Sequence, residues 1–85
     1  KNILIVDGAE AINSLNEKFN LDLPDNPGFE TLAGFMLSQL QSLPHKGKKI
    51  QFKNMVLSVE KTEGNRIAEV KIELNKKIKN DFTLK

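Results

Sequence analysis

The sequence contains no cysteine, tryptophan or tyrosine, and it has a single histidine. Without cysteine the chain forms no disulfide and offers no thiolate as a metal ligand or nucleophile. No apolar run approaches the roughly 18–20 residues that a bilayer-spanning helix requires. The apolar opening at Ile3–Val6 is interrupted at once by Asp7 and Gly8. We therefore expect no signal peptide, and we interpret the chain as a piece of a longer protein.

The length and the charge distribution limit the function further. A chain of 85 residues allows one domain with one core, and leaves little room for a deep catalytic cleft. Residues 1–43 carry two basic and six acidic residues, a balance of −4, whereas residues 44–85 carry eleven basic and five acidic residues, a balance of +6. Such a charge dipole can orient a domain against an acidic partner or a membrane surface, and an ordinary solvated face is the alternative.

The first half of the chain predicts one strand and two helices. Ile3–Val6 is a β-branched run that is apolar on both faces, which favours a strand inside the sheet rather than at its edge. The pattern over 10–19 predicts a helix, with its stripe formed by Ile12, Leu15, Asn16 and Phe19. Pro24 ends any helix there, and residues 25–28 form a loop.

A second helix is predicted to begin after Thr31, whose side chain suits the N-cap position. Its apolar stripe consists of Leu32, Phe35, Met36, Leu40 and Leu43, and Pro44 ends it. Gly34 lies inside this helix at a cost of about 1 kcal/mol relative to alanine. Close approach of the helix to the sheet explains such a glycine better than close approach of a ligand.

In the second half the hydrophobic period changes to two. Apolar residues alternate through 50–52, 55–59 and 70–74, and Thr62–Asn65 forms a hairpin loop. The expected fold class is α+β, with an antiparallel sheet of about four strands and two helices packed on one face. We expect residues 1–74 to form the domain and residues 75–85 to form a C-terminal tail.

No group of side chains predicts catalysis or a metal site. His45 is alone in a basic turn, without the partners that a metal centre or a catalytic triad needs. Asp22, Asp25 and Glu30 flank one loop, but their spacing matches no known ion-binding loop, so solvated carboxylates are the simpler interpretation. We therefore assign no catalytic and no metal-binding residue, and leave any cofactor-binding residues open.

A basic run follows the second helix, at Lys46, Lys48, Lys49 and Lys53. It could meet the phosphates of a nucleotide, a lipid or a nucleic acid. Nucleic-acid binding usually adds exposed aromatic side chains that stack on bases, and the five phenylalanines mostly occupy apolar-face positions. We therefore expect no nucleic-acid partner.

An ordered series of short motifs resembles the CorC/HlyC transporter-associated domain over about residues 4–74. The matching residues are Val6-Asp7-Gly8, Leu15-Asn16, Leu21-Asp22-Leu23-Pro24, Thr31-Leu32-Ala33-Gly34, Pro44 with Gly47, Arg66-Ile67, Val70 and Ile72. Two positions depart from the family pattern. Ala11 stands where a serine or aspartate usually caps the first helix, and Leu57 where phenylalanine is frequent. Both motif glycines and Thr31 have structural explanations, so none is carried over as a functional residue.

The resemblance implies a function as well as a fold. Family members are usually the last domain of a chain with a membrane region and a pair of CBS domains, and some are called hemolysins or magnesium and cobalt efflux proteins. It therefore implies a non-catalytic accessory domain at the cytoplasmic face of the membrane, which modulates ion transport through contacts with the preceding CBS pair and membrane domain or with a second copy. The alternative that the family implies is a binding domain for FAD or an adenine nucleotide.

Overall fold

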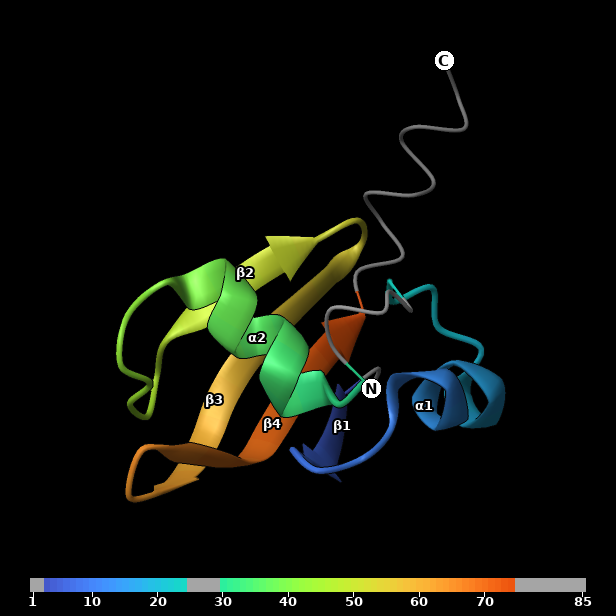
Figure 1. The fold of residues 1–85 in the computed structure, drawn as a ribbon. Helices are drawn as coiled ribbons and strands as arrows, with labels where there is room; N and C mark the ends of the chain where they lie inside the picture. The colour runs from blue at the N-terminus through green and yellow to red at the C-terminus, as the bar shows by residue number, and fades with distance from the viewer. Residues whose placement is uncertain (1–2, 25–29, 75–85) are drawn as a thin grey trace.

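The computed structural model describes residues 3–24 and 30–74, which form two helices and one four-stranded sheet (Figure 1). In chain order the elements are β1 (Ile3–Asp7), α1 (Ile12–Phe19), α2 (Leu32–Leu40), β2 (Lys49–Phe52), β3 (Met55–Glu63) and β4 (Arg66–Leu74). The sheet order is β1-β4-β3-β2, and all neighbouring strands are antiparallel. This architecture confirms the α+β class. The predicted loop at 25–28 and the tail at 75–85 lie outside the described residues.

The core lies between the helices and one face of the sheet. In Figure 1, α2 crosses this face and α1 lies toward the β1 side of the sheet. The buried apolar side chains come from both helices, from the segment after α1 and from β3 and β4: Ile12, Leu15, Leu23, Leu32, Phe35, Met36, Met55, Leu57, Val59, Ile67, Val70 and Ile72. Burying each one fully contributes roughly 1.5–3 kcal/mol, so they supply most of the gross stabilisation.

The prediction that the first strand lies inside the sheet is wrong, because β1 is an edge strand that pairs with β4 alone. Its side chains alternate between the two faces, as strand geometry requires. Leu4 and Val6 pack against the core, whereas Ile3 and Ile5 point to the other face with 47% and 53% of their surface exposed. A run that is apolar on both faces therefore marks a strand with a second apolar surface rather than a central strand.

The second helix ends earlier than predicted. Gln41 is its C-cap in the left-handed conformation with φ 56°, and the Gln41 N–H donates to the Leu37 carbonyl. Leu43 therefore lies beyond the helix, and 68% of its surface is exposed. The residue before a proline is disfavoured in the α region, which helps to explain why the helix stops before Leu43 and Pro44.

Both hairpins of the meander have two-residue turns. The predicted hairpin between β3 and β4 is present, but its turn is Gly64 and Asn65 alone, because Thr62 and Glu63 belong to β3. Gly64 has the positive φ of 63° that a hairpin turn of this kind favours. Lys53 and Asn54 join β2 to β3, and here the residue at φ 55° is the lysine. A non-glycine side chain at such a φ costs roughly 1–2 kcal/mol, and nothing in the pattern of alternation predicted this strain.

Candidate functional surface

The Asp7-Gly8 motif shapes the backbone where β1 ends. The Ala9 N–H donates to Asp7 Oδ1 at 2.8 Å, which turns the chain away from the sheet. The Gly8 N–H donates to the Ala68 carbonyl at 2.8 Å. A Cβ at Gly8 would lie 2.2 Å from the Ile67 carbonyl oxygen, far inside van der Waals contact. Gly8 is therefore required by the close approach of this segment to β4.

The N-terminus of α2 uses its free N–H groups within the domain. Three successive amides donate internally: Leu32 N to Glu10 O at 3.0 Å, Ala33 N to Gly8 O at 2.9 Å and Gly34 N to Thr31 Oγ1 at 3.1 Å. The predicted cap by Thr31 is confirmed. Amides at a helix N-terminus bind phosphate only while they are free to donate. A flavin or nucleotide phosphate would therefore have to be held elsewhere.

The N-terminus of α1 is held by main chain instead of by a side chain. Ala11 is its N-cap and provides no side-chain hydrogen bond, as its place in the motif predicted. The Ile12 N–H donates to the Glu30 carbonyl at 2.9 Å, and Ala11 forms a bridge with Thr31. The two helix starts are thus linked directly, which offsets part of the missing cap.

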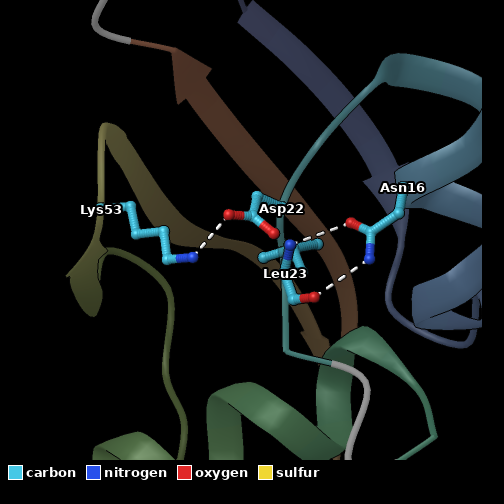
Figure 2. A network of polar contacts seen from close by, with 4 residues as sticks. All are labelled: Asn16, Asp22, Leu23 and Lys53. Atoms are coloured by element: carbon cyan, nitrogen blue, oxygen red, sulfur yellow. Dashed lines mark hydrogen bonds and ion pairs between the residues drawn. The ribbon is translucent and has the colours of Figure 1, made fainter. Parts of the chain in front are cut away.

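Asn16 holds the segment that follows α1 (Figure 2). Its Nδ2 donates to the Leu23 carbonyl at 3.0 Å, and its Oδ1 accepts from the Leu23 N–H at 2.9 Å. One side-chain amide thereby satisfies both backbone groups of Leu23, as a neighbouring strand would, and Leu23 is buried in the core. Periodicity placed Asn16 on the apolar stripe and missed this role. An asparagine among apolar positions was the available signal.

Of the three carboxylates in or beside the predicted 25–28 loop, the structure describes Asp22 and Glu30. Asp22 is exposed and makes an ion pair with Lys53 across 2.5 Å between Nζ and Oδ2, as Figure 2 shows. Glu30 is exposed, and its carbonyl rather than its carboxylate holds α1. Asp25 lies outside the described residues. Within residues 3–24 and 30–74, no group of three potential ligands could hold a metal ion.

The basic run divides into two places. Lys46 and Lys48 lie between α2 and β2, and Lys49 is the first residue of β2. Lys53 lies beyond the other end of β2, where it pairs with Asp22. Its Nζ also lies 5.5 Å from the centre of the Phe52 ring. Gly34 and the basic turn lie toward opposite ends of α2, so they are not neighbours (Figure 1). Flavin or nucleotide binding stays a prediction.

The strongest surface feature is the sheet face opposite the core, which we call the open face. Side chains on it form two rows across the strands: Ile3, Glu73, Val56 and Gln51, then Ile5, Lys71, Ser58 and Lys49. The β1 end of this face is apolar, because Ile3 and Ile5 are exposed there. Ser58 is buried although it lies on this face, between Lys71 and Lys49 in its row.

The two edges of the sheet differ in how they resist further pairing. An exposed edge strand invites another strand unless charge, proline or shortness discourages it. The β2 edge is four residues long and begins with Lys49, with Lys53 immediately after it. The β1 edge has no charged residue from Ile3 to Val6. This edge and the adjoining isoleucines are therefore the candidate docking surface.

Comparisons with known proteins agree on one family. The model of the CorC_HlyC transporter associated domain matches residues 1–76. A hemolysin domain from Enterococcus faecalis V583 is 29% identical, with a TM-score of 0.78 over 87% of this chain and 89% of that one. A conserved domain from Neisseria meningitidis MC58 is 33% identical, with a TM-score of 0.73 over 84% of this chain and 95% of that one.

A second structure from Neisseria meningitidis MC58, named for the associated region of a Mg2+ and Co2+ transporter (CorC), is 18% identical. Its TM-score is 0.76 over 87% of this chain and 90% of that one, which shows the shared fold alone. No curated protein matches the sequence. Among the described helices, none is long and apolar enough to cross a membrane.

Proposed function

Because the chain belongs to the CorC_HlyC family of transporter-associated domains, we propose that it is a non-catalytic regulatory module of a membrane divalent-cation transporter or hemolysin-like protein. It acts at the cytoplasmic face of the membrane through contacts with the preceding CBS pair and membrane domain of its parent chain. The name of the Neisseria relative, which refers to Mg2+ and Co2+, supports this choice of cargo.

The observation that carries the proposal is the contrast between the motif residues and the β1 edge. Gly8, Asn16 and Thr31 are engaged in backbone geometry and hydrogen bonds inside the domain. The backbone of Ile3 and Ile5 pairs with β4, but their side chains are exposed on the open face. A domain whose distinctive residues build the scaffold, and whose edge strand exposes two isoleucines, is suited to binding another domain by strand addition or face packing.

The mechanism is positional. Docking at β1 favours one arrangement of the CBS pair over another, and that arrangement biases the membrane domain. The bias can be no larger than the difference in docking free energy between the two arrangements. A coupling of about 1–3 kcal/mol, which is typical of allosteric proteins, would change a transport equilibrium by 5–150-fold.

The test is a transport assay on the parent protein that carries Ile5→Lys, with Phe19→Lys as the matched control. Both positions are exposed apolar residues, but Phe19 is the last residue of α1 and is not part of the β1 edge. We expect Ile5→Lys to change the transport rate or its response to nucleotide as much as deletion of residues 1–74 does, and Phe19→Lys to leave both unchanged. Transport that is insensitive to the deletion would refute the proposed function.

A further inference from the structure

Residues 31–59 contain four lysines and no acidic residue. Three of these lysines lie in one short segment, residues 43–49, which we call the lysine turn. In Figure 1 this loop between α2 and β2 lies at the opposite side of the molecule from α1. The acidic residues Glu10 and Glu17 lie just before and within α1. Within the described residues, the lysine turn and these two acidic residues thus lie at opposite sides of the molecule.

The backbone of the lysine turn is fixed by the sheet. The Lys48 N–H donates to the His45 carbonyl at 3.1 Å, and Gly47 supplies the φ of 98° that this turn needs. The Gly47 N–H donates to the Val59 carbonyl at 2.9 Å, and the Val59 N–H donates to the Lys48 carbonyl at 2.8 Å. The turn therefore presents its lysines from a backbone that is already ordered.

The lysine turn also carries an apolar side chain. Leu43 is the most exposed large hydrophobic residue of the described chain. The side chains of Lys46 and Lys49 lie on exposed residues, and Lys48 is half-buried. None of these three lysines forms an ion pair within the described part of the chain. An exposed leucine and three lysines without ion pairs within one seven-residue segment are a combination suited to the interface of an anionic bilayer.

We propose that the lysine turn docks on the surface of an anionic phospholipid bilayer, with Leu43 entering the interface and Lys46, Lys48 and Lys49 meeting lipid phosphates. Charge complementarity selects this occupant, and membership of a transporter-associated family places a bilayer within reach. The lysine turn does not include β1, so the inference goes beyond the proposed regulatory contact, and it rests on the proposed function only for the parent protein's place at the membrane. Nucleic acid fits less well, because Phe52 packs edge-on against Phe35 at 5.3 Å instead of standing free to stack.

The expected affinity is low, which fits an orienting contact rather than an anchor. Each lysine near an anionic surface contributes about a fivefold increase in partitioning. Partial burial of one leucine adds on the order of tenfold. Together they give a partition constant on the order of 10³ M⁻¹, about tenfold below that of a single myristoyl chain. A parent protein that is already held at the membrane makes so weak a contact effective.

The test is co-sedimentation of the 85-residue chain with vesicles at millimolar lipid. The vesicles contain phosphatidylcholine alone or phosphatidylcholine with about a third of phosphatidylserine, a strongly anionic composition. We expect binding to the anionic vesicles only, and loss of that binding as salt rises. The triple variant Lys46→Gln, Lys48→Gln, Lys49→Gln should bind on the order of 100-fold more weakly. Leu43→Ser should bind about tenfold more weakly.

A second triple variant, Lys18→Gln, Lys61→Gln, Lys71→Gln, removes the same charge outside the lysine turn and should lose far less binding. Thermal unfolding of each variant establishes that it is folded. Equal binding to the two kinds of vesicle, or equal losses in the two triple variants, would overturn the proposal. So would native-like binding by either Leu43→Ser or the first triple variant, or binding to RNA that competes fully with the vesicles.

Discussion

Replacing Gly8 with alanine tests whether the family motif serves the backbone. The added Cβ would lie 2.2 Å from the Ile67 carbonyl oxygen and 3.3 Å from Ala33 Cβ. To relieve the clash, residues near Gly8 must move away from β4, which weakens the hydrogen bonds from Gly8 N to Ala68 O and from Ala33 N to Gly8 O. Overpacking costs about 1–3 kcal/mol, and each weakened hydrogen bond costs about 1 kcal/mol.

The expected loss for Gly8→Ala is therefore about 3–5 kcal/mol out of a total stability on the order of 5 kcal/mol. Gly64→Ala is the matched control, because no atom lies within 4 Å of the added Cβ and only the φ of 63° is unfavourable. That variant should lose about 1–2 kcal/mol. The assay is urea denaturation followed by circular dichroism. A loss for Gly8→Ala no larger than that for Gly64→Ala would refute the reasoning.

Three further predictions concern the polar network and the ligand alternative. Asn16→Ala leaves the N–H and the carbonyl of buried Leu23 without their partner, so we expect urea denaturation to show a loss of about 2–3 kcal/mol in unfolding free energy. A loss below about 1 kcal/mol would contradict a stabilising role for these two hydrogen bonds. Lys53→Gly relieves the positive φ but removes the exposed ion pair to Asp22, so its unfolding free energy should stay within about 1 kcal/mol of the unaltered chain. Calorimetry with FAD and with ATP should show no heat at high micromolar ligand, and saturable heat with either would support the ligand-binding alternative.

Much of the fold follows from local pattern. The change of hydrophobic period from 3.6 to two separates the helices from the meander, and Gly64 with Asn65 marks the hairpin. Thr31 suits an N-cap by its own chemistry, and it caps α2. These features are predictable because the residues that determine them are neighbours in the sequence.

The rest depends on contacts between distant segments. The apolar run of β1 looks alike for a central strand and for an edge strand with a second apolar face, so only the strand order distinguishes them. The sequence predicted close packing at Gly34, because glycine is costly inside a helix. The structure shows that a side chain has no room at Gly8, and the reason is Ile67, which lies on another strand. The two hydrogen bonds between Asn16 and Leu23 likewise form only because the chain runs back past Asn16 after α1 ends.

The candidate docking surface was not predictable for the same reason. A sequence shows that Ile3 and Ile5 are apolar, but their exposure results from the position of β1 at the end of the sheet. Leu43 was assigned to a helix stripe and became an exposed residue because α2 ends at Leu40. Both surfaces that we propose for binding thus come from positions where periodicity predicted burial.

Hydrogen–deuterium exchange at β1 tests most directly whether this edge docks in the parent protein. The measurement compares the amides of Ile3–Asp7 in the isolated chain and in the parent, with Ile50–Phe52 of the β2 edge as the internal reference. Docking at β1 predicts slower exchange there in the parent and unchanged exchange at β2. Identical exchange of β1 in both proteins would contradict the account.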